Sequence, residues 1–183
     1  MELRTASNPR DVKYYDTDRL REEFLIDDLF KPDEVKMVYS HIDRIITGSA
    51  VPATKALTID AGAELRAEYF LQRREMGIIN IGGEGTVTVD GTVYTLRHKD
   101  GIYIGMGCKD IRLDSCDRSN PAKFYFNSAP AHKTYPTVYI RPEDCVKVEL
   151  GTMEESNHRT ICKYILPGQV ESCQLVMGMT SLC

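Results

Sequence analysis

The sequence lacks long apolar runs, basic clusters and any apolar leader, and each absence narrows the range of functions. No apolar segment approaches the length that crosses a bilayer, and Met1 to Asp16 is polar and charged, unlike a secretory signal. No cluster of lysine and arginine interleaved with aromatic residues occurs, and the formal net charge is −4, which disfavours nucleic acid as a partner. We therefore expect a soluble, cytoplasmic protein that binds neither membranes nor nucleic acid.

Paired cysteines are also missing. None of the six cysteines belongs to a C-x-x-C motif, and a cytoplasmic chain keeps its thiols reduced. We expect them to be small, half-buried strand residues rather than disulfide partners or zinc ligands. They are Cys108, Cys116, Cys145, Cys162, Cys173 and Cys183.

Helix signals are few, and short strand patterns fill most of the 183 residues. Asp16 and Thr17 are positioned to cap one short helix in which Leu20, Phe24 and Leu25 share a face. Asp90-Gly91 is the preferred sequence for a two-residue hairpin turn, because both central residues of that turn need positive φ. The predicted strands are Met37–Ile46, Glu68–Gln72, Met76–Ile81, Thr86–Val89, Thr92–Leu96, Gly101–Ile104, Asp110–Leu113, Lys123–Phe126, Thr137–Ile140 and Val146–Leu150.

Many short strands with Gly, Asp and Asn turns predict an all-β sandwich or barrel, and the small jelly-roll barrel of the cupin type is the best frame. The turn-like segment 151–157 suggests a domain boundary, with an N-terminal domain over residues 1–155. Two further apolar stretches, Thr160–Leu166 and Ser172–Met177, lie in residues 156–183. They either complete the first domain or open a second, and we favour the second interpretation because two strands cannot bury a face alone.

The glycine cluster at residues 82–85 does not predict a phosphate site. A phosphate-binding loop leads into a helix N-terminus, whereas Thr86–Val89 has the pattern of a strand. The glycines are therefore expected to form a turn between strands.

The cupin motifs are present here without their histidines. The first motif, G-x5-H-x-H-x3-4-E-x6-G, matches Glu75 and Gly82 but places Glu68 and Phe70 at the histidine positions. In the second motif, P-x-G-x2-H, the histidine position holds Asp110. Because an apolar ring at Phe70 would enter the metal's coordination shell, we expect no metal in this barrel.

Six residues are candidates for binding a sugar acid. Arginine offers a planar fork that matches a carboxylate, so we expect Arg73 and Arg74, together with Lys123, to bind one. The alternative for Arg73, Arg74 and Glu75 is an exposed cluster of ion pairs. His41, in a predicted strand, and His132, in a predicted loop, complete the set with Arg44, whereas His98 and His158 have the surroundings of exposed residues.

Several segments resemble the 5-keto-4-deoxyuronate isomerase family. These strings run in order over nearly the whole chain and are more specific than the cupin spacing. They are Met37–Ile46, Tyr69–Glu75, Gly77–Gly83, Pro121–Tyr125, Ala129–His132, Thr134–Thr137, Arg159–Tyr164 and Cys173–Leu175.

This resemblance implies a two-cupin zinc enzyme that forms a homo-oligomer and acts in the breakdown of pectin and related uronate polymers. The implied reaction interconverts 5-keto-4-deoxyuronate and 3-deoxy-D-glycero-2,5-hexodiulosonate, with a base that moves a proton between adjacent carbons. The family's metal ligands belong to the second cupin, so the resemblance also implies that this chain stops before them and is inactive alone. The alternatives are a non-catalytic cupin that binds a sugar acid or scaffolds an oligomer, and an isomerase of 5-deoxyglucuronate.

Overall fold

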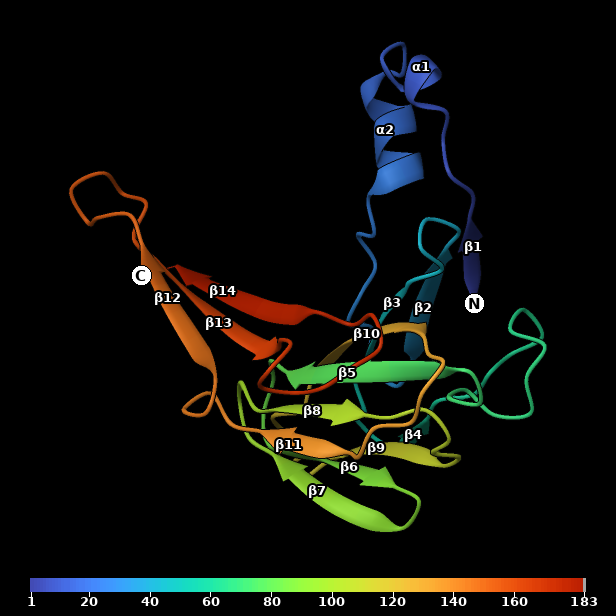
Figure 1. Cartoon of the computed structure of the whole chain (residues 1–183), viewed down its shortest axis with the longest axis vertical. Coiled ribbons are helices and arrows are strands. Elements are labelled where there is room, and N and C mark those ends of the chain that lie inside the picture. Colours follow the sequence, from blue (N-terminus) through green and yellow to red (C-terminus); the bar gives the residue numbers. More distant parts are fainter. Residues whose placement is uncertain (183) are drawn as a thin grey trace.

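The computed structural model describes residues 1–182, so the prediction for Cys183 falls outside the described residues. Within that range the fold is built from strands, with two short helices near the N-terminus (Figure 1). The helices are α1 (Pro9–Val12) and α2 (Thr17–Phe24). The strands are β1 (Glu2–Arg4), β2 (Val35–Ser40), β3 (Ile46–Ala50), β4 (Leu57–Thr58), β5 (Arg74–Asn80), β6 (Gly85–Val89), β7 (Thr92–Leu96), β8 (Gly101–Ile104), β9 (Ile111–Ser115), β10 (Phe124–Pro130), β11 (Val138–Ile140), β12 (Val146–Leu150), β13 (Arg159–Ile165) and β14 (Met177–Leu182).

Strands β3 to β10 form two facing layers. One layer has the order β3-β10-β5-β8 inside a seven-stranded sheet that also contains β1, β2 and β11, and the other has the order β4-β9-β6-β7. This is the strand order of an eight-stranded jelly roll. The predicted all-β class and jelly-roll barrel of the cupin type are therefore confirmed.

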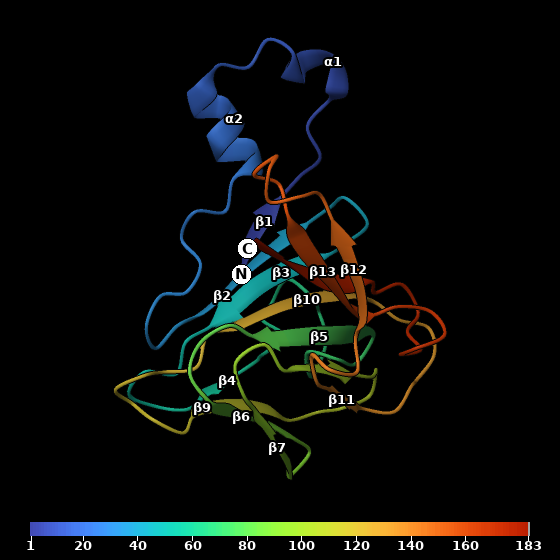
Figure 2. The same cartoon turned by 90° about the vertical axis from the view of Figure 1, so that its left-hand side faces the viewer.

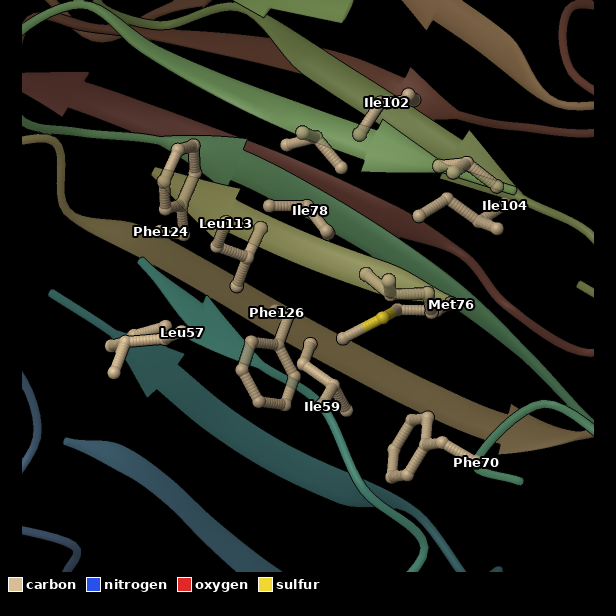
Figure 3. Close-up of a cluster of buried hydrophobic side chains, with 14 of the residues drawn as sticks. Leu57, Ile59, Phe70, Met76, Ile78, Ile102, Ile104, Leu113, Phe124 and Phe126 are labelled. Atoms are coloured by element: carbon tan, nitrogen blue, oxygen red, sulfur yellow. The ribbon is translucent and has the colours of Figure 1, made fainter. Parts of the chain in front are cut away.

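The main core lies between these two layers. Alternate residues of a strand point to opposite faces of the sheet, so Met76 and Ile78 of β5 point inward and meet Phe124 and Phe126 of β10. Phe70 lies at one end of this cluster, beside Met76 (Figure 3). Burial of these large apolar side chains is the main favourable contribution to the stability of the barrel.

A third sheet, with the order β12-β13-β14, covers the outer face of β5 and β8. Figure 2 shows it on one side of β5 and the four-stranded layer on the other. Gly77 permits this contact, because a Cβ there would lie 2.6 Å from Ile165 Cδ1 and 2.7 Å from Met177 Sδ. Strand β5 is consequently buried on both faces along its whole length.

The pairing of β12 and β13 crosses the domain boundary predicted after residue 155. Val146 pairs with Lys163, and Leu150 pairs with Arg159. The outer sheet thus combines a strand assigned to the first domain with strands from the residues beyond it. The division into residues 1–155 and 156–183 stays a prediction.

Helix α2 begins where its sequence signals place it, but it ends at Phe24, one residue before the predicted helical position Leu25. The Asp16 side chain caps it by accepting a 2.9 Å hydrogen bond from the backbone N–H of Arg19. The apolar face is present, but Leu20, Phe24 and Leu25 are all exposed, and the helix stands away from the sheets (Figure 1). No helix within residues 1–182 is long and apolar enough to span a bilayer.

Three strand predictions need correction. Residues 37–46 form two strands, β2 and β3, because Asp43 and Arg44 adopt left-handed φ values of 53° and 54° and turn the chain. Residues 68–72 form an irregular segment, in which Phe70 is buried although it lies outside any strand. The last strand begins at Met177, and residues 172–176 form a loop instead.

Several turn and cysteine predictions are confirmed. Asp90 and Gly91 have φ values of 46° and 83° between β6 and β7. The glycine cluster connects β5 to β6, so it is a turn between strands. All five cysteines within the described residues are free, but the prediction that they are half-buried strand residues is wrong for most of them, because only Cys162 lies in a strand and their burial ranges from buried to exposed.

Candidate functional site

A cleft of about 440 Å³ opens beside the first residues of β5, and we call it the arginine cleft. Its walls come from the end of β2, the turn after it, the irregular segment before β5, the loop after β10 and the loop before β14. Its lining residues are Tyr39, Arg44, Glu64, Leu65, Ala67, Phe70, Arg73, Arg74, Pro130, Ala131, His132 and Gln174. Four of the six predicted binding residues therefore meet in one place.

Arg74 is the buried charge of the cleft, with only 6% of its surface exposed. Its Nε donates to Ser128 Oγ at 3.0 Å, and its Nη2 donates to the carbonyl oxygens of Ser128 and Arg44, both at 2.7 Å. The guanidinium carbon also lies 5.6 Å from the centroid of the Tyr39 ring. All of these partners are neutral, and Arg74 forms no ion pair within residues 1–182.

The electrostatics of Arg74 follow from this environment. The pKa of its guanidinium is lowered to about 10, mainly by burial, while Tyr39 acts in the opposite direction and the nearby charge of Arg44 adds a smaller lowering. A charged group whose charge is disfavoured in the folded protein gains most from an anion placed beside it. The positive charge of Arg74 is therefore not balanced by any negative charge beside it in the cleft.

Arg73 and Arg44 add further positive charge to the cleft from more exposed positions. Arg73 donates to the carbonyl oxygens of Leu65 and Arg66 at 3.2 and 2.9 Å, which fixes its position at the cleft wall. Neither arginine forms an ion pair within the described part of the chain. Glu64 is the one acidic residue among those that line the cleft, and it lies 3.7 Å from the N-terminal amine. The net charge of the lining is positive.

The histidines divide between the cleft and the surface. His132 is exposed and lines the cleft, as its predicted loop position allows. His41 was predicted in a strand but lies in the turn after β2, outside the lining, with its ring edge-on to Tyr39 at 5.5 Å between centroids. His98 is exposed as expected, whereas His158 is half-buried, with its Nε2 at 2.9 Å from Glu149 Oε2.

Lys123 is not part of this group. It precedes β10 at the end where Phe124 pairs with Asn80, whereas Arg74 pairs with Pro130 at the opposite end of the same ladder. Its exposed side chain lines a separate depression beside the Gly82–Gly83 turn. The prediction that Lys123 lies beside the arginines is therefore wrong.

The alternative prediction, an exposed cluster of ion pairs formed by Arg73, Arg74 and Glu75, is also wrong. Arg74 and Glu75 are buried, and they lie on opposite faces of β5.

The four positions that correspond to the cupin metal motif do not converge. Glu68 and Asp110 are exposed on separate segments, and Phe70 is packed in the core. The Glu75 carboxylate accepts four hydrogen bonds from the protein itself. Residues 1–182 contain no group of three His, Cys, Asp or Glu side chains able to hold a metal ion. The described residues thus do not fit the zinc ion that the family resemblance implies.

Sequence reasoning missed Gln174 as a member of the site. The residue comes from the loop before β14, a hundred residues after Arg74 in the chain. Its one available signal was a polar residue within an apolar stretch, which is common at the ends of strands. Long-range packing, rather than a local motif, brings Gln174 to the cleft.

The chain matches known proteins over nearly all of its length. The model of the KduI/IolB family matches residues 25–182. Proteins named 4-deoxy-L-threo-5-hexosulose-uronate ketol-isomerase from Lachnoclostridium phytofermentans, Lachnospira eligens and Escherichia coli strain SE11 are 76%, 61% and 49% identical to it. Each match covers 100% of this chain and 66% of the relative, so the chain spans just under two thirds of their length.

A solved structure supports the fold alone. The crystal structure of an IolB-like protein from Salmonella typhimurium LT2 superposes with a TM-score of 0.54 at 13% sequence identity. The match covers 70% of this chain and 47% of that protein. At this level of identity the likeness concerns the barrel and carries no information about the ligand.

Proposed function

Because the chain belongs to the KduI/IolB family, we propose that the whole protein is a ketol-isomerase of 4-deoxy-L-threo-5-hexosulose uronate. We further propose that the arginine cleft binds the carboxylate of this sugar acid. The breakdown of pectin as its setting, a cytoplasmic location and assembly as a homo-oligomer belong to the same proposal. The observation that carries the binding site is Arg74, a buried guanidinium with neutral partners only.

The chemistry of the substrate matches the chemistry of the cleft. A uronate carries one carboxylate, which is ionised at neutral pH, and guanidinium groups bind carboxylates through charge-assisted hydrogen bonds. The Nε and Nη2 of Arg74 already donate to Ser128 and Arg44, so its Nη1 is the nitrogen that remains for the carboxylate. Arg74 is preorganised by Ser128 and by the Arg44 carbonyl, so little side-chain entropy is lost on binding. The volume of about 440 Å³ suits a six-carbon sugar acid.

Binding and orientation are the roles proposed for the residues of this chain. In a ketol-isomerisation a proton moves between adjacent carbons while a carbonyl and a hydroxyl exchange places. Fixing the carboxylate at Arg74 orients the rest of the sugar relative to the reacting groups. His132, in the loop after β10, also lines the cleft and offers ring nitrogens to the sugar hydroxyls. The described residues do not fit a metal, so no step is assigned to one.

The test compares the binding of D-galacturonate and of neutral D-galactose by calorimetry. We expect galacturonate to bind and Arg74→Gln to weaken it at least about 30-fold, because one partner of a buried charge pair is removed. Arg97→Gln is the matched control, because Arg97 is exposed and pairs with Glu84 away from the cleft. Unchanged affinity in Arg74→Gln would contradict the proposed binding site.

Turnover decides between the isomerase and the second candidate. Conversion of 4-deoxy-L-threo-5-hexosulose uronate that falls in Arg74→Gln supports the ketol-isomerase, and the rate with 5-deoxyglucuronate tests the related substrate. Binding without turnover by this chain would favour a non-catalytic sugar-acid-binding protein. That alternative draws its support from the cleft, which offers a binding site for an anion but no fitted metal site.

A further inference from the structure

Glu75 is a buried carboxylate that the protein satisfies by itself. Its Oε1 accepts hydrogen bonds from the backbone N–H groups of Gln174 and Leu175 at 2.8 and 2.9 Å. Its Oε2 accepts from the backbone N–H of Cys173 and from the Tyr103 hydroxyl, both at 2.8 Å. Three consecutive backbone N–H groups of the loop are thus held by one carboxylate on β5. Hydrogen bonds of this kind stabilise a buried charge without a cation.

The hydrogen bonds to Glu75 fix the loop before β14 next to the arginine cleft. Leu175 is buried in the outer core, and Ser172 Oγ donates to the Leu175 carbonyl oxygen at 2.7 Å. Gln174 lies between two anchored neighbours and is one of the residues that line the cleft. Its side-chain amide makes no hydrogen bond within residues 1–182, so the amide donor and acceptor are both free for a ligand.

The arginines and the amide would recognise different parts of a ligand. Guanidinium groups bind any carboxylate and cannot by themselves distinguish a sugar acid from a short fatty acid. A primary amide presents a donor and an acceptor side by side, which suits a hydroxyl next to a carbonyl or a second hydroxyl. A site built to hydrogen-bond a substrate hydroxyl discriminates against analogues that lack it.

We infer that Gln174 is a specificity-determining residue of the arginine cleft, and that Glu75 is the positioning residue that holds it there. The inference rests on the proposed function, because it assigns the contact beside the carboxylate of a bound sugar acid. Arg74 and Glu75 are adjacent in the chain, so one short stretch of β5 sets both the charge contact and the selective contact.

The experiment measures the selectivity ratio, which is the affinity for D-galacturonate divided by the affinity for propionate, by NMR titration of the folded chain. Gln174→Ala is expected to weaken galacturonate about tenfold through the loss of two hydrogen bonds, while propionate changes less than about twofold. Arg74→Gln should weaken both ligands. Glu75→Gln replaces one acceptor oxygen with a donor, so it should lower the selectivity ratio in the same direction as Gln174→Ala.

Tyr103→Phe is the matched control, because it removes one donor to Glu75 and leaves the three backbone donors in place. It should leave the selectivity ratio unchanged. If Glu75→Gln does not fold, Gln174→Ala, whose exposed side chain has no structural partner, carries the test. An unchanged ratio in Gln174→Ala, with both ligands weakened in Arg74→Gln, would overturn this inference alone. Failure of the unaltered chain to bind galacturonate would overturn it together with the proposed function.

Discussion

The two faces of β5 at its first residues handle buried charge in different ways. On the outer face, Glu75 is completely buried and accepts four hydrogen bonds from its own chain. On the inner face, Arg74 is almost as buried, but only its Nε and Nη2 have partners, and its Nη1 donates to none within residues 1–182. The Glu75 charge is thus satisfied by the fold, whereas the Arg74 charge is only partly compensated, in agreement with its proposed role in binding a carboxylate.

The two residues are therefore expected to affect different properties of the protein, Glu75 its stability and Arg74 its binding of a ligand. A buried group with a complete set of partners contributes to holding the structure together, as Glu75 does for the loop before β14. A buried charge with incomplete compensation is a cost of folding that a bound carboxylate offsets. Burial alone would not distinguish these two residues, whereas their hydrogen-bond partners do.

The largest effect is expected from removing the satisfied charge. Glu75→Ala leaves three backbone N–H groups and the Tyr103 hydroxyl without an acceptor inside the protein. The free energy of unfolding should fall by about 3 kcal/mol or more, measured by chemical denaturation. Glu68→Ala, at an exposed position on the segment before β5, should change it by less than about 0.5 kcal/mol. Equal effects of the two variants would contradict a structural role for Glu75.

A smaller effect on stability is expected on the inner face. Arg74→Met removes a charge that has no ionic partner, but it also removes the hydrogen bonds to Ser128 and to the Arg44 carbonyl, so the free energy of unfolding of the unliganded protein should fall by about 1–2 kcal/mol, less than in Glu75→Ala. Added galacturonate should raise the thermal midpoint of the unaltered protein but not of Arg74→Met. A loss of stability as large as that of Glu75→Ala would mean that Arg74 is also a structural residue.

The smallest effect concerns pH. The folded-state pKa of Arg74, about 10, lies below that of an ordinary, exposed arginine. Because the unfolded chain binds this proton more readily than the folded protein does, the free energy of unfolding decreases as pH falls through about 10. At neutral pH the charged form of Arg74 therefore lowers the stability of the fold. Galacturonate affinity should be constant from about pH 6 to 9 and should fall by about half at pH 10, as Arg74 loses its proton.

Calorimetric titrations at several pH values, with circular dichroism to confirm folding at each, provide the measurement. Affinity that persists unchanged to about pH 12 would indicate that ordinary, exposed arginines carry the binding instead.

Local patterns predicted the elements wherever one neighbouring turn or cap decides the structure. The Asp16 cap and the Asp90-Gly91 turn are confirmed for this reason. The patterns failed where packing overrides alternation, as in the segment around Phe70 and in the loop that Glu75 holds before β14. They also gave no reason for α2 to stand away from the sheets with its apolar face exposed.

The sequence by itself determined the all-β class, most strands of the jelly roll and the family resemblance, because these depend on local periodicity, turn chemistry and long shared strings. It also supplied the arginines and His132 as candidates. Only the tertiary structure decided that Lys123 lies at the far end of the ladder and that Gln174 joins Arg74. The physical reason is that the direction of a side chain depends on which face of a sheet is covered, and the outer sheet that covers β5 is formed by residues far along the chain.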